Sequence, residues 1–175
     1  MCGICGFTGQ VVDRDDVIRN MTEVITHRGR DSDGFFTDDY ISMGFRRLSI
    51  IDLDAGHQPI YNEDKSLVLT FNGEIYNYRA LRTRLQRLGH RFATDSDTEV
   101  LLHGYEAWGT ALPRRLRGMF AFALWDRRTG TLFCARDLFG IKPLYYYQRG
   151  QQLLFASEIK ALLAHPAFEK KLNEA

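Results

Sequence analysis

A cysteine stands at position 2 of the chain, directly after Met1. Small residues at the second position generally permit removal of the first methionine, and Cys2 would then carry a free α-amine. The reference pKa is ~7.7–8.0 for an α-amine and ~8.5 for a thiol, so the two groups can exchange a proton near neutral pH, directly or through a water molecule. One residue then supplies both nucleophile and general base, which is the chemistry of an N-terminal nucleophile. The alternative is a small buried cysteine near a chain end.

Cys2 and Cys5 also form a C-x-x-C pair, and Cys134 is the third cysteine. A zinc site needs two more ligands at suitable spacing. No matching pair is found among the scattered histidines His27, His57, His90, His103 and His165. If residues 3–8 form a strand, Cys2 and Cys5 point to opposite faces, which disfavours a shared metal or a disulfide. We therefore expect no metal site, and the odd number of cysteines indicates a reducing, cytoplasmic setting.

The elements that must position Cys2 are mostly strands. Apolar, β-branched and aromatic runs predict them at residues 3–8, 40–51, 67–71, 119–125, 131–135, 144–147 and 153–156. Leu81, Leu85 and Leu88 recur at helical spacing after Asn77 and predict a helix that buries these leucines. The run from Ser96 to Glu99 has the spacing of a capping box and predicts a second helix. Helices are also expected near residues 15–25 and 157–163. Antiparallel strands with helices on their outer faces predict an α+β layered domain.

The composition narrows the class of protein. The chain has 175 residues, with 23 Lys+Arg against 22 Asp+Glu, so electrostatics do not favour a nucleic-acid partner. An aromatic content of 13% is enough to build a core and excludes disorder. The longest apolar run, residues 119–125, falls far short of the ~20 residues that a membrane helix needs. Residues 1–6 lack the basic and apolar regions of a signal peptide, so we expect neither secretion nor a membrane partner.

Several short motifs occur along the chain in a fixed order. They are Met1-Cys2-Gly3-Ile4-Cys5-Gly6, His27-Arg28-Gly29, Asp31-Ser32-Asp33-Gly34, Arg47-Leu48-Ser49-Ile50-Ile51-Asp52, Gly56-His57-Gln58-Pro59, Phe71-Asn72-Gly73-Glu74-Ile75-Tyr76-Asn77, Ser96-Asp97-Thr98-Glu99, and Arg136-Asp137 followed by Gly140 and Lys142-Pro143-Leu144-Tyr145-Tyr146. The set resembles the glutaminase domain of class II glutamine amidotransferases, and within that group it is most similar to glutamine-hydrolysing asparagine synthetases. One position departs from the family pattern, since Arg30 stands where the family usually has proline.

The resemblance implies an N-terminal-nucleophile hydrolase fold, a four-layer α/β/β/α sandwich of two antiparallel sheets. It implies hydrolysis of the side-chain amide of L-glutamine to glutamate and ammonia through a thioester on Cys2. It implies a glutaminase domain over residues 1–165 and a linker or tail over 166–175. The ammonia would pass to a synthetase domain or subunit, which this chain lacks. No cofactor is expected for the glutaminase half-reaction, whereas ATP and Mg would serve the synthetase domain.

The resemblance also implies roles for individual residues. Asn72 offers a side-chain N–H₂ and Gly73 a backbone N–H to the oxyanion formed when the thiolate attacks. Arg47 can hold the α-carboxylate of glutamine with its planar fork. Asp97 would receive the α-ammonium, with Glu74 as a second acidic group nearby. The backbone of Leu48, Ser49, Ile50 and Ile51 would border the glutamine pocket.

Each of these residues also has a simpler interpretation. Asn72-Gly73 can be a plain hairpin turn, Arg47 a strand arginine in an ion pair, and Asp97 an ordinary helix-start carboxylate. At the level of the whole domain, the alternatives are an amidotransferase with a different ammonia acceptor, a non-catalytic domain that binds glutamine or a partner, and a metal or redox module.

Overall fold

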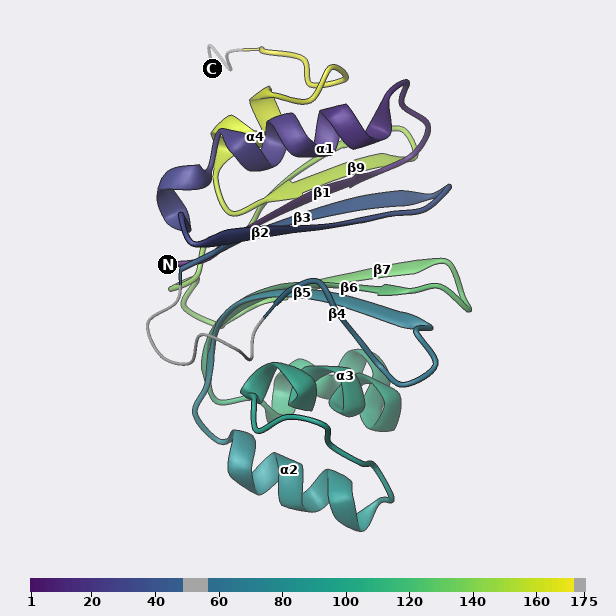
Figure 1. Ribbon diagram of the computed structural model, residues 1–175, viewed down its shortest axis with the longest axis vertical. Coiled ribbons are helices and arrows are strands. Elements are labelled where there is room, and N and C mark those ends of the chain that lie inside the picture. Colours follow the sequence, from purple (N-terminus) through teal and green to yellow (C-terminus); the bar gives the residue numbers. More distant parts are fainter. Residues whose placement is uncertain (49–56, 172–175) are drawn as a thin grey trace.

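Two antiparallel β-sheets face each other in the computed structural model, which describes residues 1–48 and 57–171 (Figure 1). Sheet A has the strand order β2-β3-β1-β9-β8, so that β1 is its central strand. Its strands are β1 (Gly3–Thr8), β2 (Ser32–Thr37), β3 (Ile41–Arg47), β8 (Tyr145–Arg149) and β9 (Gln152–Ala156). Both chain segments that flank β1 in the sheet, β3 and β9, run antiparallel to it.

Sheet B has the order β4-β5-β6-β7 and is also antiparallel throughout. Its strands are β4 (Ile60–Tyr61), β5 (Leu67–Ile75), β6 (Gly118–Asp126) and β7 (Thr131–Arg136). β4 is only two residues long and pairs with Leu69 and Val68. One edge of β5 therefore extends well beyond its neighbour on that side.

Helices cover the outer face of each sheet, which gives four layers (Figure 1). Helices α1 and α4 lie over sheet A, α3 lies over sheet B, and α2 packs against α3. The helices are α1 (Arg14–Glu23), α2 (Tyr78–Arg87), α3 (Asp97–Trp108) and α4 (Ile159–Leu163), with 3₁₀ turns η1 (Thr26–Arg28) and η2 (Gly109–Arg115). The four-layer α/β/β/α arrangement expected from the sequence is confirmed.

Alternation along the strands sorts the side chains between the layers. In β1, Cys5 and Phe7 pack with residues of α1 and α4, whereas Ile4 packs with Phe45 and with Ala121 of sheet B. In β5, Leu67, Leu69, Phe71 and Ile75 pack with residues of α2 and α3, whereas Val68 packs against sheet A. Even-numbered residues of β1 and β5 thus meet in the layer between the sheets.

Helix α2 differs from the sequence prediction at both ends. Leu81 and Leu85 are buried, but Leu88 is 58% exposed because it is the C-cap residue, beyond the last helical turn. Asn77 precedes the helix without capping it. Its side chain bonds instead to the carbonyl oxygen of Arg115 and the N–H of Arg117. The helix is therefore tied to the segment that leads into β6.

Among the described residues, none of the helices has the length and apolar character needed to cross a membrane.

Candidate active site

Cys2 lies at the start of the central strand, at the mouth of the layer between the two sheets. Its side chain packs against the cluster of Ile4, Phe45 and Ala121, which comes from both sheets. The Cys2 thiol is 3.9 Å from the carbonyl oxygen of Leu48. Cys2 is partly accessible, whereas Cys5 is buried on the other face of the same strand. The prediction that the two thiols point to opposite faces is therefore correct, and both cysteines are free.

Arg47 lies beside Cys2 on the same face of sheet A. Gly3 pairs with Arg46 in the β1–β3 ladder, so extending the register by one residue places Cys2 opposite Arg47. Arg47 ends β3 on the face that also carries Met43 and Phe45, which both point to the inter-sheet layer. Its side chain is 7% exposed. Arg47 and Cys2 thus lie at the same end of this layer.

A buried ion pair holds the backbone of Cys2. The Nε of Arg28 donates to the Cys2 carbonyl oxygen at 3.0 Å, and Nη1 of Arg28 donates to Glu158 at 3.0 Å. Burial would raise the pKa of Glu158, but hydrogen bonds from His27, Arg28 and Lys160 hold that pKa down at about 2. Sequence reasoning assigned no role to Arg28 or Glu158. The motif His27-Arg28-Gly29 was the available signal, but its partner lies 130 residues further along the chain.

Asn72 occupies the facing position in sheet B. It pairs with Ala121, the residue of sheet B that packs in the Cys2 cluster. As an even-numbered residue of β5, it points toward sheet A, as Val68 does. Asn72 is 2% exposed, and within residues 1–48 and 57–171 its Nδ2 atom has no hydrogen-bond partner. A buried amide donor is left available in the layer that Cys2 borders.

Gly73 follows Asn72 at the free edge of β5. The N–H and carbonyl of Phe71 are bonded at this edge by the side chain of Gln58, at 2.6 and 3.1 Å. Backbone groups alternate along an antiparallel strand, so Gly73 and Ile75 present their N–H groups to the same edge. Ile75 donates to Asp97, but the Gly73 N–H finds no acceptor in the described part of the chain. This edge thus offers a backbone donor next to the Asn72 amide.

Asn72 and Gly73 do not form a turn, because both lie inside β5 and pair with Ala121 and Phe120 of β6. The hairpin-turn interpretation of this dipeptide is wrong. Glycine is required at position 73 for space, since a Cβ atom there would lie 2.2 Å from the carbonyl oxygen of Met119. The glycine lets β5 and β6 approach closely in the part of β5 that no longer pairs with β4.

Asp97 opens helix α3 and reaches the same strand. The side chain of Ser96 caps the helix by accepting from the N–H of Thr98, and the Asp97 carboxylate accepts from the N–H of Ile75 at 2.8 Å. Burial raises the pKa of Asp97, and the negative charge of the exposed Glu74 adds to this increase. The position of Asp97 is therefore set by sheet B as well as by its own helix.

The remaining predicted pocket residues are Leu48, which lies beside the Cys2 thiol, and Ser49, Ile50 and Ile51, which lie outside the described residues.

A fixed loop forms another side of the Cys2 region. The Asp137 carboxylate accepts hydrogen bonds from four backbone N–H groups, those of Phe120, Phe139, Ile141 and Lys142. Although burial opposes it, these bonds lower the pKa of Asp137. The Lys142 ammonium, which is 6% exposed, lies 3.2 Å from the sulfur of Met1. Asp137 therefore anchors this loop to Phe120 of β6, the residue that pairs with Gly73.

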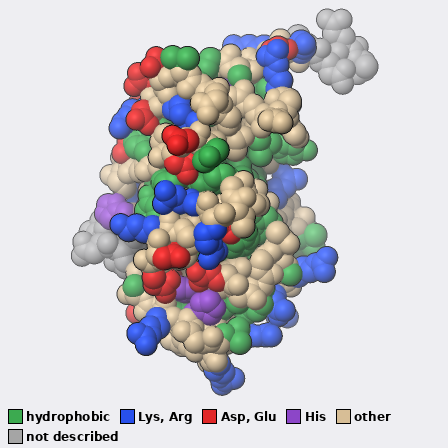
Figure 2. All heavy atoms as spheres, turned by 90° about the vertical axis from the view of Figure 1, so that its right-hand side faces the viewer, with side chains coloured by type: hydrophobic (Ala, Val, Ile, Leu, Met, Phe, Trp, Pro, Cys, Tyr) green, Lys and Arg blue, Asp and Glu red, His purple; other side chains and the backbone are tan. Residues whose placement is uncertain are grey.

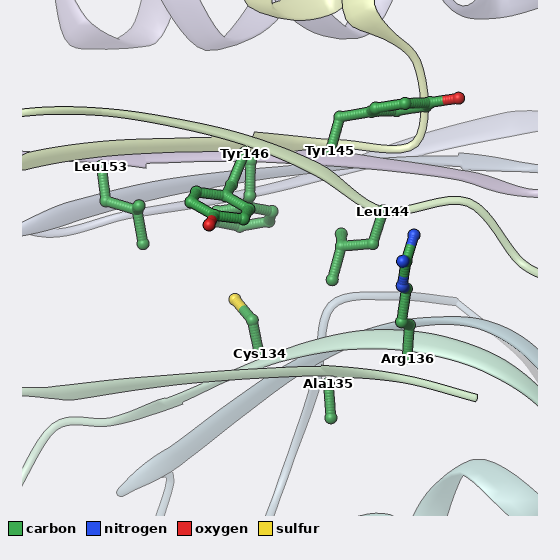
Figure 3. Close-up of a pocket in the computed structure, with 8 residues that line it drawn as sticks. Cys134, Ala135, Arg136, Leu144, Tyr145, Tyr146 and Leu153 are labelled. Atoms are coloured by element: carbon green, nitrogen blue, oxygen red, sulfur yellow. The ribbon is translucent and has the colours of Figure 1, made fainter. Parts of the chain in front are cut away.

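A cavity of about 570 Å³ lies between β7 and β8 (Figure 3), and Cys2 is not among the residues that line it. The thiol of Cys134 points into it, toward Tyr146, as Figure 3 shows. Burial raises the pKa of the Cys134 thiol to about 12, and burial likewise raises that of Cys5 to about 12 despite a contact with Thr22. Neither thiol is a nucleophile near neutral pH, which leaves Cys2.

Comparison with known proteins agrees with this geometry. A sequence profile described as "Glutamine amidotransferase domain" matches residues 1–175. The chain is 49% identical over 168 residues to asparagine synthetase [glutamine-hydrolyzing] 1 of Bacillus subtilis, covering 91% of this chain and 27% of the relative. It is 42% identical over 167 residues to asparagine synthetase [glutamine-hydrolyzing] 3 of Arabidopsis thaliana, covering 93% and 28%. The chain thus spans about a quarter of the length of these curated relatives.

A solved structure shares the fold. Glutamine phosphoribosylpyrophosphate amidotransferase from B. subtilis superimposes with a TM-score of 0.78 at 22% identity, over 93% of this chain and 43% of that one. The match of the family profile along the whole chain, together with relatives above 40% identity, establishes the family. This chain belongs to the glutamine amidotransferase domain family.

Proposed function

We propose that this domain hydrolyses the side-chain amide of L-glutamine to glutamate and ammonia, with Cys2 as the nucleophile. The observation that carries the proposal is the meeting of one accessible thiol with two available N–H donors. Cys2 packs with Ala121, Asn72 pairs with Ala121 in the β5–β6 ladder, and Gly73 is the next residue at the edge of β5. Acyl transfer requires this combination of a nucleophile and an oxyanion site.

The reaction begins after removal of Met1, which frees the α-amine of Cys2. The amine takes the thiol proton while the sulfur forms a bond to the amide carbon of glutamine. The resulting tetrahedral intermediate collapses as the amine returns the proton to the leaving nitrogen, so that the C–N bond breaks and ammonia departs. Water, deprotonated by the same amine, then attacks the thioester, releases glutamate and restores the thiol.

The oxyanion of both tetrahedral intermediates would be held by Asn72 and Gly73. Asn72 is suited to this because its buried Nδ2 donor is not committed elsewhere among the described residues. Leaving a buried donor unsatisfied costs free energy in the resting protein. An oxyanion that fills the position recovers this free energy in the transition state, where the gain accelerates the reaction.

Free glutamine has two charged ends, and the site has a matching pair of groups. The Arg47 guanidinium would bind the α-carboxylate, and Asp97, assisted by Glu74, would bind the α-ammonium. The raised pKa of Asp97 supports this assignment, because the ionised carboxylate lacks a compensating cation that the substrate would supply. Leu48, with Ser49, Ile50 and Ile51, would contribute backbone contacts to the substrate.

The whole protein would use this ammonia to make asparagine in the cytoplasm, as the names of the relatives suggest. The glutaminase half-reaction needs no metal or organic cofactor, whereas ATP and Mg would act in a synthetase portion.

Ammonia release tests the proposal directly. Intact mass establishes whether Met1 has been removed, and the processed protein should release ammonia only when glutamine is added. Cys2→Ser should abolish this release without lowering Tm, and a glutamine-like electrophile such as diazo-oxo-norleucine should modify Cys2 alone. Processed protein that releases no ammonia, or a Cys2→Ser variant as active as its parent, would refute the proposal.

A further inference from the structure

Two buried histidines each have an Nε2 atom without a hydrogen-bond partner in the described part of the chain. His103 in α3 is 1% exposed and His165 after α4 is 2% exposed. Their surroundings differ. The ring of His165 packs edge-on against the ring of Phe7, with 4.6 Å between the ring centroids. Burial lowers the pKa of His165 to about 4. His103, by contrast, lies among three carboxylates.

Glu106 fixes the orientation of the His103 ring. Its Oε2 atom is 2.9 Å from Nδ1 of His103 and 3.3 Å from Nδ1 of His90, and its Oε1 atom accepts from Asn62 at 2.9 Å. A histidine that donates from Nδ1 to a carboxylate carries its lone pair on Nε2. This is the arrangement in which proteins present imidazole to a metal ion.

The free Nε2 atom faces two further carboxylates. It lies 3.6 Å from Oε1 of Glu99 and 3.9 Å from Oε1 of Glu63. All three residues line a cavity of about 250 Å³, to which Arg91 also contributes. Figure 2 shows acidic and histidine side chains close together on the surface of the half built from sheet B, α2 and α3, whereas His103 itself is buried.

These separations leave Nε2 of His103 close to two carboxylates but hydrogen-bonded to neither. Both separations exceed the ~3.2 Å limit of a good hydrogen bond to nitrogen. Zinc binds imidazole nitrogen and carboxylate oxygen at about 2.0–2.2 Å, which puts neighbouring tetrahedral ligands roughly 3.3–3.6 Å apart. Small side-chain movements would bring Glu63, which is exposed, into this range.

We propose that Nε2 of His103, with the carboxylates of Glu99 and Glu63, binds a divalent transition-metal ion of the Zn²⁺ type, with water completing the coordination. The ion would connect three segments. Glu63 lies in the β4–β5 turn, His103 lies in α3, and Glu99 already binds the N–H groups of Ala93 and Thr94 ahead of α3. The ion would stabilise the start of the helix that carries Asp97, and it takes no part in the reaction at Cys2.

Metal binding is measured on protein freed of metal by a chelator. Titration with Zn²⁺ should show one site by calorimetry and raise Tm, and Co²⁺ should give the visible absorption of a tetrahedral nitrogen and oxygen site. Glu63→Gln, at an exposed position, should weaken binding at least about tenfold. His103→Gln should abolish it. The matched controls His165→Gln, equally buried, and Glu169→Gln, also on the surface, should bind like the parent.

Three results would overturn the proposal. One is a parent protein that shows neither heat nor a Co²⁺ band, in which case the cavity holds only protons or water. Another is an unchanged affinity for Zn²⁺ in Glu63→Gln. Because Glu63 is exposed, this result stands even if His103→Gln fails to fold. The third is a Co²⁺–thiolate band that disappears in Cys2→Ser, since the metal would then be bound by the nucleophile instead of by His103. Glutaminase activity does not enter any of these measurements.

Discussion

The carboxylate of Asp97 accepts a hydrogen bond from the backbone N–H of Ile75 at 2.8 Å. This bond joins the first residue of α3 to the last residue of β5, the strand that carries Asn72 and Gly73. The proposed binding group for the substrate ammonium and the proposed oxyanion donors are therefore fixed to one strand. A change in Asp97 tests substrate binding and the resting stability of this strand end together.

Asp97→Asn should bind glutamine more weakly and yet be more stable. The amide oxygen can still accept from Ile75, but the ion pair with the substrate ammonium, worth about 1.5–3 kcal/mol, is lost, so KM should rise roughly 10–100-fold. The pKa of Asp97 is raised in the folded state, so the folded protein holds this proton more tightly than the unfolded chain. The parent therefore loses stability as pH rises from about 3.8 through the folded-state value, and the variant does not. Asp95→Asn, at an exposed position just before α3, is the control. An unchanged KM would remove Asp97 from the substrate site.

Gly73→Ala should lower stability, and it should lower kcat much more than Gly150→Ala does. The added Cβ would meet the Met119 carbonyl oxygen at 2.2 Å and the Phe120 Cα at 2.7 Å, which pushes β5 away from β6 beside Asn72. Displacing the oxyanion donors should reduce kcat by about 10²–10³. Gly150→Ala is the control, because its φ of 58° costs about 1–2 kcal/mol while its Cβ touches nothing within 4 Å. Equal kcat in the two variants would contradict the role of Gly73.

Iodoacetamide at pH 8 should modify Cys2 before the other two thiols. Because burial raises the pKa of Cys5 and Cys134 to about 12, only roughly one molecule in ten thousand carries either thiolate at this pH. Peptide mass spectrometry over time should place the first adduct on Cys2 and show activity falling in step with it. Early labelling of Cys134 would contradict the assignment of this thiol as unreactive.

Glu158→Gln should weaken the fold in a pH-dependent way and also lower kcat. The pKa of Glu158 is held at about 2, below its usual value of 4.5, so its ion pairs stabilise the protein fully above about pH 4.5 and are lost as pH falls toward 2. The variant should have a lower Tm at pH 7, and this difference from the parent should disappear by pH 2. Since Arg28 joins Glu158 to the Cys2 carbonyl, kcat should fall as well. A Tm difference that is independent of pH would exclude this ion pair as the cause.

The sequence was informative where a local pattern decides the structure. Period-two alternation correctly separated Cys2 from Cys5, and the Ser96 cap correctly started α3. It was misleading at Asn72-Gly73, because the dipeptide favours turns in isolation, whereas here pairing with β6 keeps both residues extended. Leu88 was misplaced because helical spacing does not show where the last turn ends.

Contacts between distant parts of the chain could not be predicted. Arg28 contacts Glu158 across 130 residues of sequence. The N–H of Gly73 is left without a strand partner because β4 is only two residues long. The carboxylates around His103 come from α3 and from the β4–β5 turn, so spacing along the chain does not reveal the cluster. Such features depend on how the layers pack, which no local pattern encodes.

The strand that begins just after Cys2 has a neighbour on each side, β3 on one and β9 on the other. Local opening cannot release a strand held in this way, so its amide protons should exchange with solvent only when the entire domain unfolds. Warming should then leave the nucleophile in place until the cooperative transition, and catalytic activity and native circular dichroism should disappear at the same temperature.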